Sequence, residues 1–155
     1  MAKAVSLKTT LEVRDACLCL AAQRAARALA RRFDRAFRPL GLTNGQFSLL
    51  MALNRPQPAP MGDIARVLGL DRTTLTAALK PLIRRKLVAA TPDTGDRRSR
   101  LVCLAWRGRR LLARAVPFWR IHHRALERQL RLSPQILRAA LDTLSAPTRG
   151  AAGRD

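Results

Sequence analysis

The chain has 155 residues, a length that fits one domain with a sizeable hydrophobic core. Its 30 Lys and Arg residues outnumber 10 Asp and Glu, which gives a formal net charge of +20, and 48% of its residues are hydrophobic. This composition excludes a disordered basic tail, and no apolar run reaches the roughly 18 residues of a membrane span.

The excess of positive charge predicts a polyanionic partner, most simply nucleic acid. An Arg-rich composition with no specific partner is the alternative, but such a bias does not explain why Asp and Glu are scarce. Segments 1–38, 39–60, 61–104 and 105–155 contribute +6, +1, +5 and +8, so we expect a folded body with a broad positive field. The chain begins without the apolar core of a signal peptide, and its three cysteines form no disulfide framework, so we expect a cytoplasmic protein with no membrane partner.

The first predicted element is one helix over residues 11–38. Its apolar residues recur at helical spacing on one face, namely Cys19, Ala22, Ala26, Ala30, Phe33 and Phe37. Thr43 or Asn44 then caps a second helix through residues 46–53. The Pro-rich stretch 55–60 favours an extended connector.

Residues 61–86 predict two short helices that are joined by a tight turn at Gly69 and Leu70. Asp71 is placed to cap the second helix, which runs from residue 72 to about residue 85. Two short strands, 87–90 and 101–104, follow and enclose a hairpin tip that is rich in Arg and turn residues. A long helix over residues 107–130 and a final helix over 133–144 complete the predicted elements.

Helix, turn, helix and two-stranded ribbon form the layout of a winged helix. We therefore predict a mainly α fold with a small β-wing in a single domain over residues 1–155. Residues 56–105 form the winged helix-turn-helix lobe, residues 11–55 and 106–145 form long dimerisation helices, and residues 146–155 form a tail.

The second helix of the pair is the predicted recognition helix. Leu75, Leu79 and Leu82 can face the core, which turns the polar residues Arg72, Thr73, Thr76 and Lys80 outward. Hydroxyl and guanidinium groups at the start of such a helix can reach base edges and phosphates in the major groove. An ordinary amphipathic helix with a solvated polar face is the alternative interpretation.

The hairpin tip favours the DNA-binding interpretation. Arg97, Arg98 and Arg100 lie within four residues, on a loop that can enter the narrow minor groove. Asp96 lies two residues before Arg98 and can hold its guanidinium in one orientation. A solvated charged turn is the alternative.

These stretches closely resemble the MarR family of bacterial transcriptional regulators. The resemblance rests on residues 62–76, on Lys86-Leu-Val and on the wing residues 96–104, and it extends over about residues 11–145. It implies a homodimer whose terminal helices intertwine and whose two lobes bind double-stranded DNA at a palindromic operator. By this resemblance Arg72, Thr73, Thr74 and Thr76 enter the major groove, and Arg98, held by Asp96, enters the minor groove.

Three residues depart from the family pattern. Lys86 replaces the Gly that usually follows the recognition helix, and a left-handed conformation there would cost about 1 kcal/mol. Ala105 replaces a capping Thr after the wing, a loss typically worth about 1 kcal/mol. Pro81 lies inside the recognition helix and is expected to bend it or to remove one backbone bond.

Cys17 and Cys19 are candidate redox residues. On one helix they point about 200° apart and cannot bond to each other. Cys17 shares a face with Arg24 and Arg35, where positive charge favours a thiolate. Cys19-Leu-Ala together with Arg27-Ala28 is similar to the reactive-cysteine helix of family members that sense organic hydroperoxides, although the chain lacks the tyrosines that those members use. Two small packing residues are the simpler interpretation.

An effector pocket is the second candidate site for a signal. Trp119 and His122 share a face of the long C-terminal helix, and His122 is either a core histidine or a polar group in a pocket. The resemblance implies a pocket for small aromatic acids. Neighbouring Arg side chains would suit the carboxylate of such an acid. We assign Cys19, Phe47, Trp119 and His122 to this pocket.

The sequence therefore predicts a transcriptional repressor that is released by a small aromatic or phenolic ligand or by cysteine oxidation. One alternative is a nonspecific architectural DNA-binding protein, and another is a soft-metal sensor, suggested by Cys-Leu-Cys with only Cys103 and two histidines as further ligands. We assign no metal site and no cofactor. The sequence lacks a nucleophile–base grouping and a phosphate-binding Gly loop, so no enzyme is expected.

Overall fold

The computed structural model describes residues 4–93, 95 and 100–145. Its helices are α1 (Leu7–Ala16), α2 (Leu18–Phe37), the 3₁₀ helix η1 (Arg38–Leu40), α3 (Asn44–Ala52), α4 (Met61–Leu68), α5 (Arg72–Arg84), α6 (Trp106–Glu127) and α7 (Pro134–Ser145). Its strands are β1 (Ala59–Pro60), β2 (Val88–Pro92) and β3 (Arg100–Leu104). This arrangement confirms the predicted mainly α fold with a small β-wing. In the described part of the chain, no helix is both long and apolar enough to cross a membrane.

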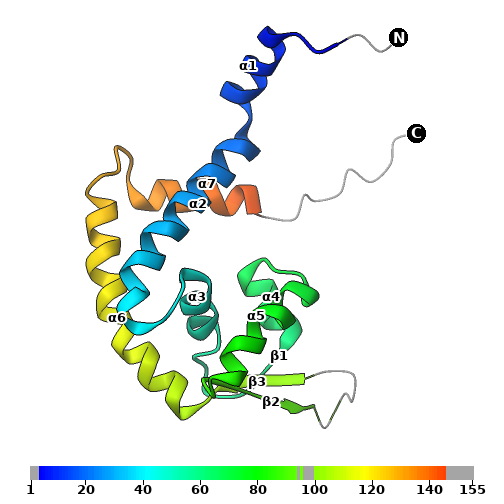
Figure 1. Cartoon of the computed structure of the whole chain (residues 1–155), viewed down its shortest axis with the longest axis vertical. Coiled ribbons are helices and arrows are strands. Elements are labelled where there is room, and N and C mark those ends of the chain that lie inside the picture. Colours follow the sequence, from blue (N-terminus) through cyan, green and yellow to red (C-terminus); the bar gives the residue numbers. More distant parts are fainter. Residues whose placement is uncertain (1–3, 94, 96–99, 146–155) are drawn as a thin grey trace.

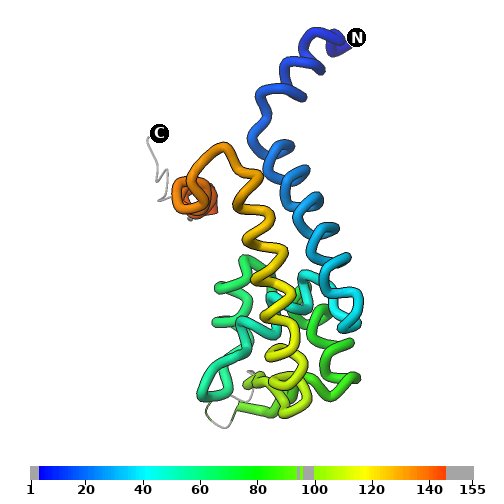
Figure 2. The backbone as a smooth tube through the Cα atoms, turned by 90° about the vertical axis from the view of Figure 1, so that its left-hand side faces the viewer, coloured from blue at the N-terminus to red at the C-terminus, as the bar shows by residue number. Residues whose placement is uncertain are grey.

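The long helices α2 and α6 run side by side, and the lobe of α3, α4, α5 and the sheet packs at one end of them (Figures 1 and 2). At the other end, α1 projects away from the lobe and α7 follows the end of α6. No residue of α1 or α7 is buried. The single chain therefore has a packed lobe and an unpacked helical end.

The hydrophobic core lies in the lobe and in the adjoining parts of α2 and α6. Its largest fully buried side chains are Phe37, Leu50, Ile64, Leu75, Leu82 and Val102. The rings of Phe37 and Phe47 stack with their centroids 4.5 Å apart, which joins the end of α2 to α3. The lobe is thus anchored on the scaffold by aromatic packing.

The predicted helix over residues 11–38 is wrong as one element. The structure has two helices, which break at Cys17, where φ is −74° and ψ is 107°. The Cys17 Sγ accepts a hydrogen bond from the Leu20 backbone N–H at 3.4 Å, so this side chain caps α2. Apolar periodicity missed the break because neither Pro nor Gly marks it, and because a cysteine cap is unusual.

The wing contains three strands, whereas the sequence predicted two. Ala59 and Pro60, in the segment predicted as a connector, pair with Leu101 and Val102, so the strand order is β1-β3-β2. Pro60 lacks a backbone N–H, and an edge strand is where a sheet tolerates that loss. The Pro-rich segment therefore holds the wing against the lobe.

Gly108 joins α6 to the base of the wing. A Cβ added at this buried glycine would lie 2.1 Å from the Leu87 carbonyl oxygen, and that same oxygen accepts the Ala105 backbone N–H at 3.0 Å. The start of α6 therefore packs directly on the backbone that leads into β2. The predicted helix over residues 107–130 gives no sign of this contact, because it joins residues that are far apart in the sequence.

We expect Gly108→Ala to lower the free energy of unfolding by about 1–3 kcal/mol, because the backbone of Leu87 must move away from the new methyl group. Gly62→Ala is the control, since a Cβ at this helical glycine meets no atom within 4 Å. The control should be neutral or slightly stabilising, because Ala favours helix over Gly. Urea unfolding measures both variants, and equal effects would contradict the proposed close contact.

Three helices end in the same left-handed turn. Gly41, Gly69 and Lys86 have φ of 62°, 62° and 56°. After α5, the Leu87 N–H donates to the Leu82 carbonyl and the Lys86 N–H to the Ile83 carbonyl, both at 2.9 Å, which is a Schellman motif. Lys86 therefore has the left-handed backbone conformation for which strain was expected. Glycine adopts this conformation without strain, whereas a residue with a Cβ does not.

Lys86→Gly is therefore expected to raise the free energy of unfolding by about 1 kcal/mol. Lys86→Ala removes the same charge but keeps a Cβ at positive φ, so it should give little or none of this gain. Urea titration of the three proteins separates backbone strain from charge. A gain of the same size in both variants would assign the effect to charge.

The other two departures are also visible in the described backbone. Ala105 stands at the N-cap of α6 without a side-chain cap. Pro81 lies inside α5, which continues to Arg84 without the backbone bond that Pro81 cannot donate. Neither departure prevents the wing and the helix pair from forming.

Candidate nucleic-acid interface

The position of α5 is fixed by its two ends. The turn at Gly69 separates it from α4, and the Asp71 side chain caps its first turn. Asp71 accepts the Thr74 backbone N–H at 2.8 Å and the Thr74 hydroxyl at 2.5 Å. Hydrogen bonds from the Thr74 hydroxyl and then from backbone N–H groups hold the pKa of Asp71 below its usual value. Thr74 thus has a capping role, which its predicted role as a DNA contact did not include.

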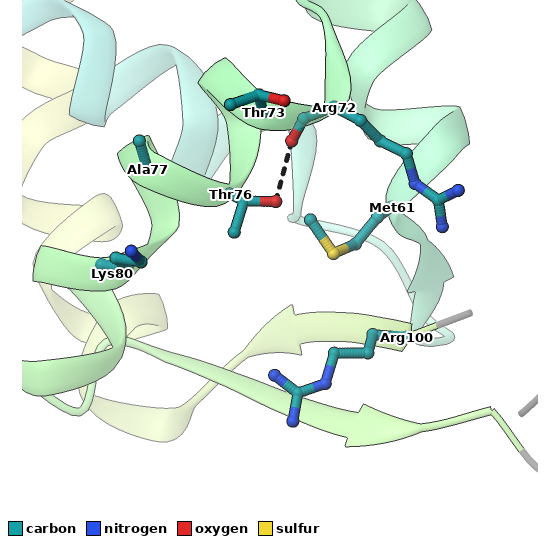
Figure 3. A pocket seen from close by; sticks show the side chains of 7 residues that line it. All are labelled: Met61, Arg72, Thr73, Thr76, Ala77, Lys80 and Arg100. Carbon is teal, nitrogen blue, oxygen red and sulfur yellow. Dashed lines mark hydrogen bonds between the residues drawn. The ribbon is translucent and has the colours of Figure 1, made fainter. Parts of the chain in front are cut away.

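The two faces of α5 are divided as the sequence predicted. Leu75, Leu79 and Leu82 are buried in the core. The exposed face carries the predicted polar residues Arg72, Thr73, Thr76 and Lys80. The Thr76 hydroxyl donates to the Arg72 carbonyl at 2.8 Å, so the orientation of this side chain is set within the helix (Figure 3).

The exposed face of α5 and strand β3 border one surface cavity of about 380 Å³. Its lining residues are Met61, Arg72, Thr73, Thr76, Ala77, Lys80 and Arg100. Arg72 from α5 and Arg100 from β3 lie on two sides of Met61 (Figure 3). Among the described residues, the lining contains three basic side chains and no acidic one, so it can accept an anionic backbone beside the start of a helix.

Met61 and Ala77 are lining residues that the sequence analysis did not assign to this surface. Ala77 lies four residues after Thr73, and helical spacing could have found it. Met61 is 8% exposed and is contributed by the adjacent helix α4, so only the tertiary arrangement places it here. The predicted contacts Asp96, Arg97 and Arg98 lie outside the described residues and stay predictions.

The four residues that were assigned to an effector pocket do not line one cavity in the structure. Phe47 and Trp119 line a largely apolar cavity of about 570 Å³, together with Ser48, Met51, Ala52, Val67, Leu68, Val116 and Arg120. This cavity lies between α3, α4 and α6. Arg120 is the charged residue in its lining, a contribution that the sequence analysis did not specify.

Cys19 and His122 do not line this cavity, so the single chain does not bring the four assigned residues together. His122 lies about 60° around α6 from Trp119, enough to turn it toward α2 instead of α3. It lines a separate cavity with Arg32, Arg35 and Phe118. Trp119 instead packs against His123, with ring centroids 4.6 Å apart and the ring planes tilted by 31°. Cys19 is exposed on α2.

The two candidate redox cysteines occupy different environments. Cys17 is half-buried at the break between α1 and α2, whereas Cys19 is exposed and its Sγ accepts the Gln23 Nε2–H at 3.3 Å. Because Cys17 stands at a helix boundary, helical geometry does not set the angle between its side chain and that of Cys19, and the predicted separation of about 200° does not apply. Among the described residues, no three His, Cys, Asp or Glu side chains are grouped as metal ligands.

Comparison with known proteins identifies the family. A family model described as MarR family matches residues 40–99, from η1 to the wing. The MosR transcriptional regulator of M. tuberculosis, solved in complex with DNA, is 35% identical with a TM-score of 0.77, over 83% of this chain and 93% of that chain. The chain belongs to the MarR family. The predicted resemblance is thereby confirmed.

Two further MarR relatives extend the comparison. The transcriptional activatory protein BadR of Rhodopseudomonas palustris is 44% identical over 78 residues, which are 48% of this chain and 45% of BadR. That match therefore spans less than half of BadR. The transcriptional repressor CouR, solved with bound p-coumaroyl-CoA, is 27% identical with a TM-score of 0.75, over 86% of this chain and 94% of that chain. The winged-helix fold class is confirmed across these proteins.

Proposed function

We propose that this MarR protein is a homodimeric, sequence-specific DNA-binding regulator that represses transcription and acts by binding rather than by catalysis. The observation that carries the proposal is the basic cavity between the exposed face of α5 and β3, where Arg72, Thr73, Thr76, Lys80 and Arg100 meet. In this proposal the α5 side chains enter the major groove, and the wing residues Arg97 and Arg98 enter the minor groove. The DNA-bound state of the related MosR supports DNA as the partner.

Selection of bound duplexes from random sequence by the full-length protein tests this function. We expect an enriched palindrome whose half-site centres lie about one helical turn, roughly 10 base pairs, apart. The two half-sites should have the same sequence on opposite strands, because each is bound by one of two identical lobes. Recovery of unenriched sequence would contradict the proposal and would favour the architectural alternative.

The homodimer is supported by the apolar residues that the single chain leaves exposed. Among the exposed large apolar side chains of the described residues, eight lie on α1, α2 and α7, namely Leu7, Leu11, Val13, Leu18, Leu29, Ile136, Leu141 and Leu144. A second copy that packs on these helices would bury this surface and would place a second lobe beside the first. One helix-turn-helix lobe makes few contacts, so two lobes also account for specific recognition.

The proposed effector site is the apolar cavity of Phe47, Trp119 and Arg120. Its volume of about 570 Å³ suits a small aromatic ring, and the Arg120 guanidinium suits a carboxylate or another acyl oxygen. The cavity lies between the scaffold helix α6 and the α3–α4 part of the lobe, so a ligand there can favour one lobe orientation over another. The p-coumaroyl-CoA complex of CouR supports an aromatic acyl ligand.

A thermal-shift screen of aromatic acids and their thioesters checks this assignment. A ligand that stabilises the wild type should lose at least about tenfold in affinity in Trp119→Ala, which removes a wall of the cavity. Cys19→Ser is the control, because that side chain lies outside the cavity. An unchanged affinity in Trp119→Ala would place the effector elsewhere.

Cysteine oxidation is a second candidate signal, because Cys17 caps α2 where the backbone departs from helix. Oxidation of the Cys17 thiol to the sulfenic acid by a hydroperoxide, which leaves as water or an alcohol, would place an oxygen atom on the sulfur that caps α2 and so alter the α1–α2 junction within the proposed dimer surface. Under this proposal an oxidant lowers operator affinity in the wild type but not in Cys17→Ser. An oxidant without effect on the wild type would exclude it. The soft-metal alternative gains no support, since the described residues present no metal-ligand group.

A further inference from the structure

We propose that the cavity between α2 and α6 is a binding site for a small phosphate-bearing anion, separate from the effector cavity and from the DNA-binding surface. Its volume is about 430 Å³, and its lining consists of Arg32, Arg35, Ala36, Pro39, Phe118 and His122. Two guanidinium groups and one imidazole thus line one cavity together with three apolar side chains.

The two cavities beside α6 take their lining from different residues of that helix. At about 100° per residue, Phe118 and His122 lie about 160° around α6 from Val116 and Arg120, which line the effector cavity, whereas Trp119, which also lines that cavity, lies about 60° from His122. The two cavities have no lining residue in common. A small ligand in one cavity therefore leaves the other accessible.

In the part of the chain that the structure describes, no ion pair neutralises the charges that line the α2–α6 cavity. Within the described residues, none of the salt bridges involves Arg32, Arg35 or His122. The Arg32 Nη1–H donates to the neutral Gln129 side chain at 2.7 Å, which orients this guanidinium without cancelling its charge. The cavity therefore keeps its positive charge and has one cation held in position.

The number and kind of these groups select the ligand class. One guanidinium binds one carboxylate through both oxygens, whereas two guanidiniums and an imidazole from two helices suit a group with three or more anionic oxygens. Phosphate and diphosphate groups meet this requirement. The half-buried Phe118 and the Pro39 and Ala36 side chains give an apolar surface for the body of a phosphate ester.

Isothermal titration of the full-length protein with pyrophosphate and phenyl phosphate, in about 0.15 M salt and at constant ionic strength, tests the site. We expect saturable binding that weakens about tenfold in Arg35→Gln and in Arg32→Gln. Arg124→Gln is the control, because this exposed residue lies on α6 about 140° away from the cavity and removes the same charge. The control should bind as the wild type does.

Several results would overturn the proposal. Equal losses in Arg35→Gln and Arg124→Gln would show that diffuse charge attracts the anion. Benzoate that binds as tightly as phenyl phosphate would change the class from phosphate to carboxylate. A loss of DNA affinity in Arg35→Gln that matches the loss of pyrophosphate affinity would assign the cavity to a DNA phosphate. The titration does not depend on operator binding, so this site and the proposed regulator function can fail separately.

Discussion

Arg72→Ala is expected to weaken binding to the selected operator by more than about 30-fold and to leave the free energy of unfolding unchanged. One specific side-chain contact to a base is worth about 1–3 kcal/mol, and a dimer loses two of them. Arg72 is exposed on the first turn of α5 and lines the basic cavity with Arg100. Removal of this side chain should therefore remove a contact with DNA without removing any contact in the hydrophobic core.

Arg84→Ala is the matched control for this prediction. Arg84 is also an exposed arginine of α5, but it lies in the last turn of that helix and does not line the cavity. Its loss should reduce affinity for all duplexes by a similar small factor, as expected for long-range charge. Fluorescence anisotropy on the operator and on a scrambled duplex distinguishes the two effects. Equal losses in both variants on both duplexes would contradict a recognition role for Arg72.

Leu141→Glu is expected to convert the dimer to a monomer at micromolar concentration and to lower operator affinity by roughly 10²–10⁴-fold. Leu141 is 45% exposed on α7, a helix that buries no residue within the single chain. A carboxylate there would lose its water in the proposed dimer without gaining a partner. Separated lobes then bind half-sites independently and lose the effective concentration that links them.

Thr143→Glu provides the control for the dimer prediction. It places the same charge on α7 two residues later, at an exposed polar position on a different side of the helix. Sedimentation velocity should give a dimer for Thr143→Glu and a monomer for Leu141→Glu. A dimer of unchanged stability in Leu141→Glu would exclude α7 from the interface.

The lobe was predictable because its sequence carries local signals that agree with each other. Asp71 as a cap, Gly69 as a turn and Leu75, Leu79 and Leu82 as one face each require only the helical period and known cap chemistry. The helical period also predicted which residues of α5 are exposed. The strand β1 was not predictable in this way, because its pairing with β3 joins residues 59 and 102 and depends on the folded lobe.

The helices outside the lobe were predicted less well. The spacing of their apolar residues predicts a helix face but not which part of the protein packs against that face. The break at Cys17 lies in a region where few side chains are buried within one chain, so the pattern alone favoured a continuous helix. The residues assigned to the effector pocket are divided between two cavities in the single chain for a related reason. Trp119 and His122 belong to one broad face of α6, but α3 and α2 pack against different sides of that face and divide it into two cavities.

Only a small part of the net charge of +20 lies on the proposed recognition surface. Arg72, Lys80 and Arg100 are the basic residues of the described cavity, and much of the remaining charge lies on α2 and α6. Charge of this kind raises affinity for any duplex and makes binding sensitive to salt. Specificity has to come from the few side chains that reach base edges.

The ratio of affinities for the selected palindrome and for a scrambled duplex of the same length and composition tests the central claim most directly. At about 0.15 M salt, paired winged lobes that read bases should give a ratio of at least about 10³. A ratio near one, with the same salt dependence on both duplexes, would mean that this MarR protein binds DNA through its charge alone and does not select a site.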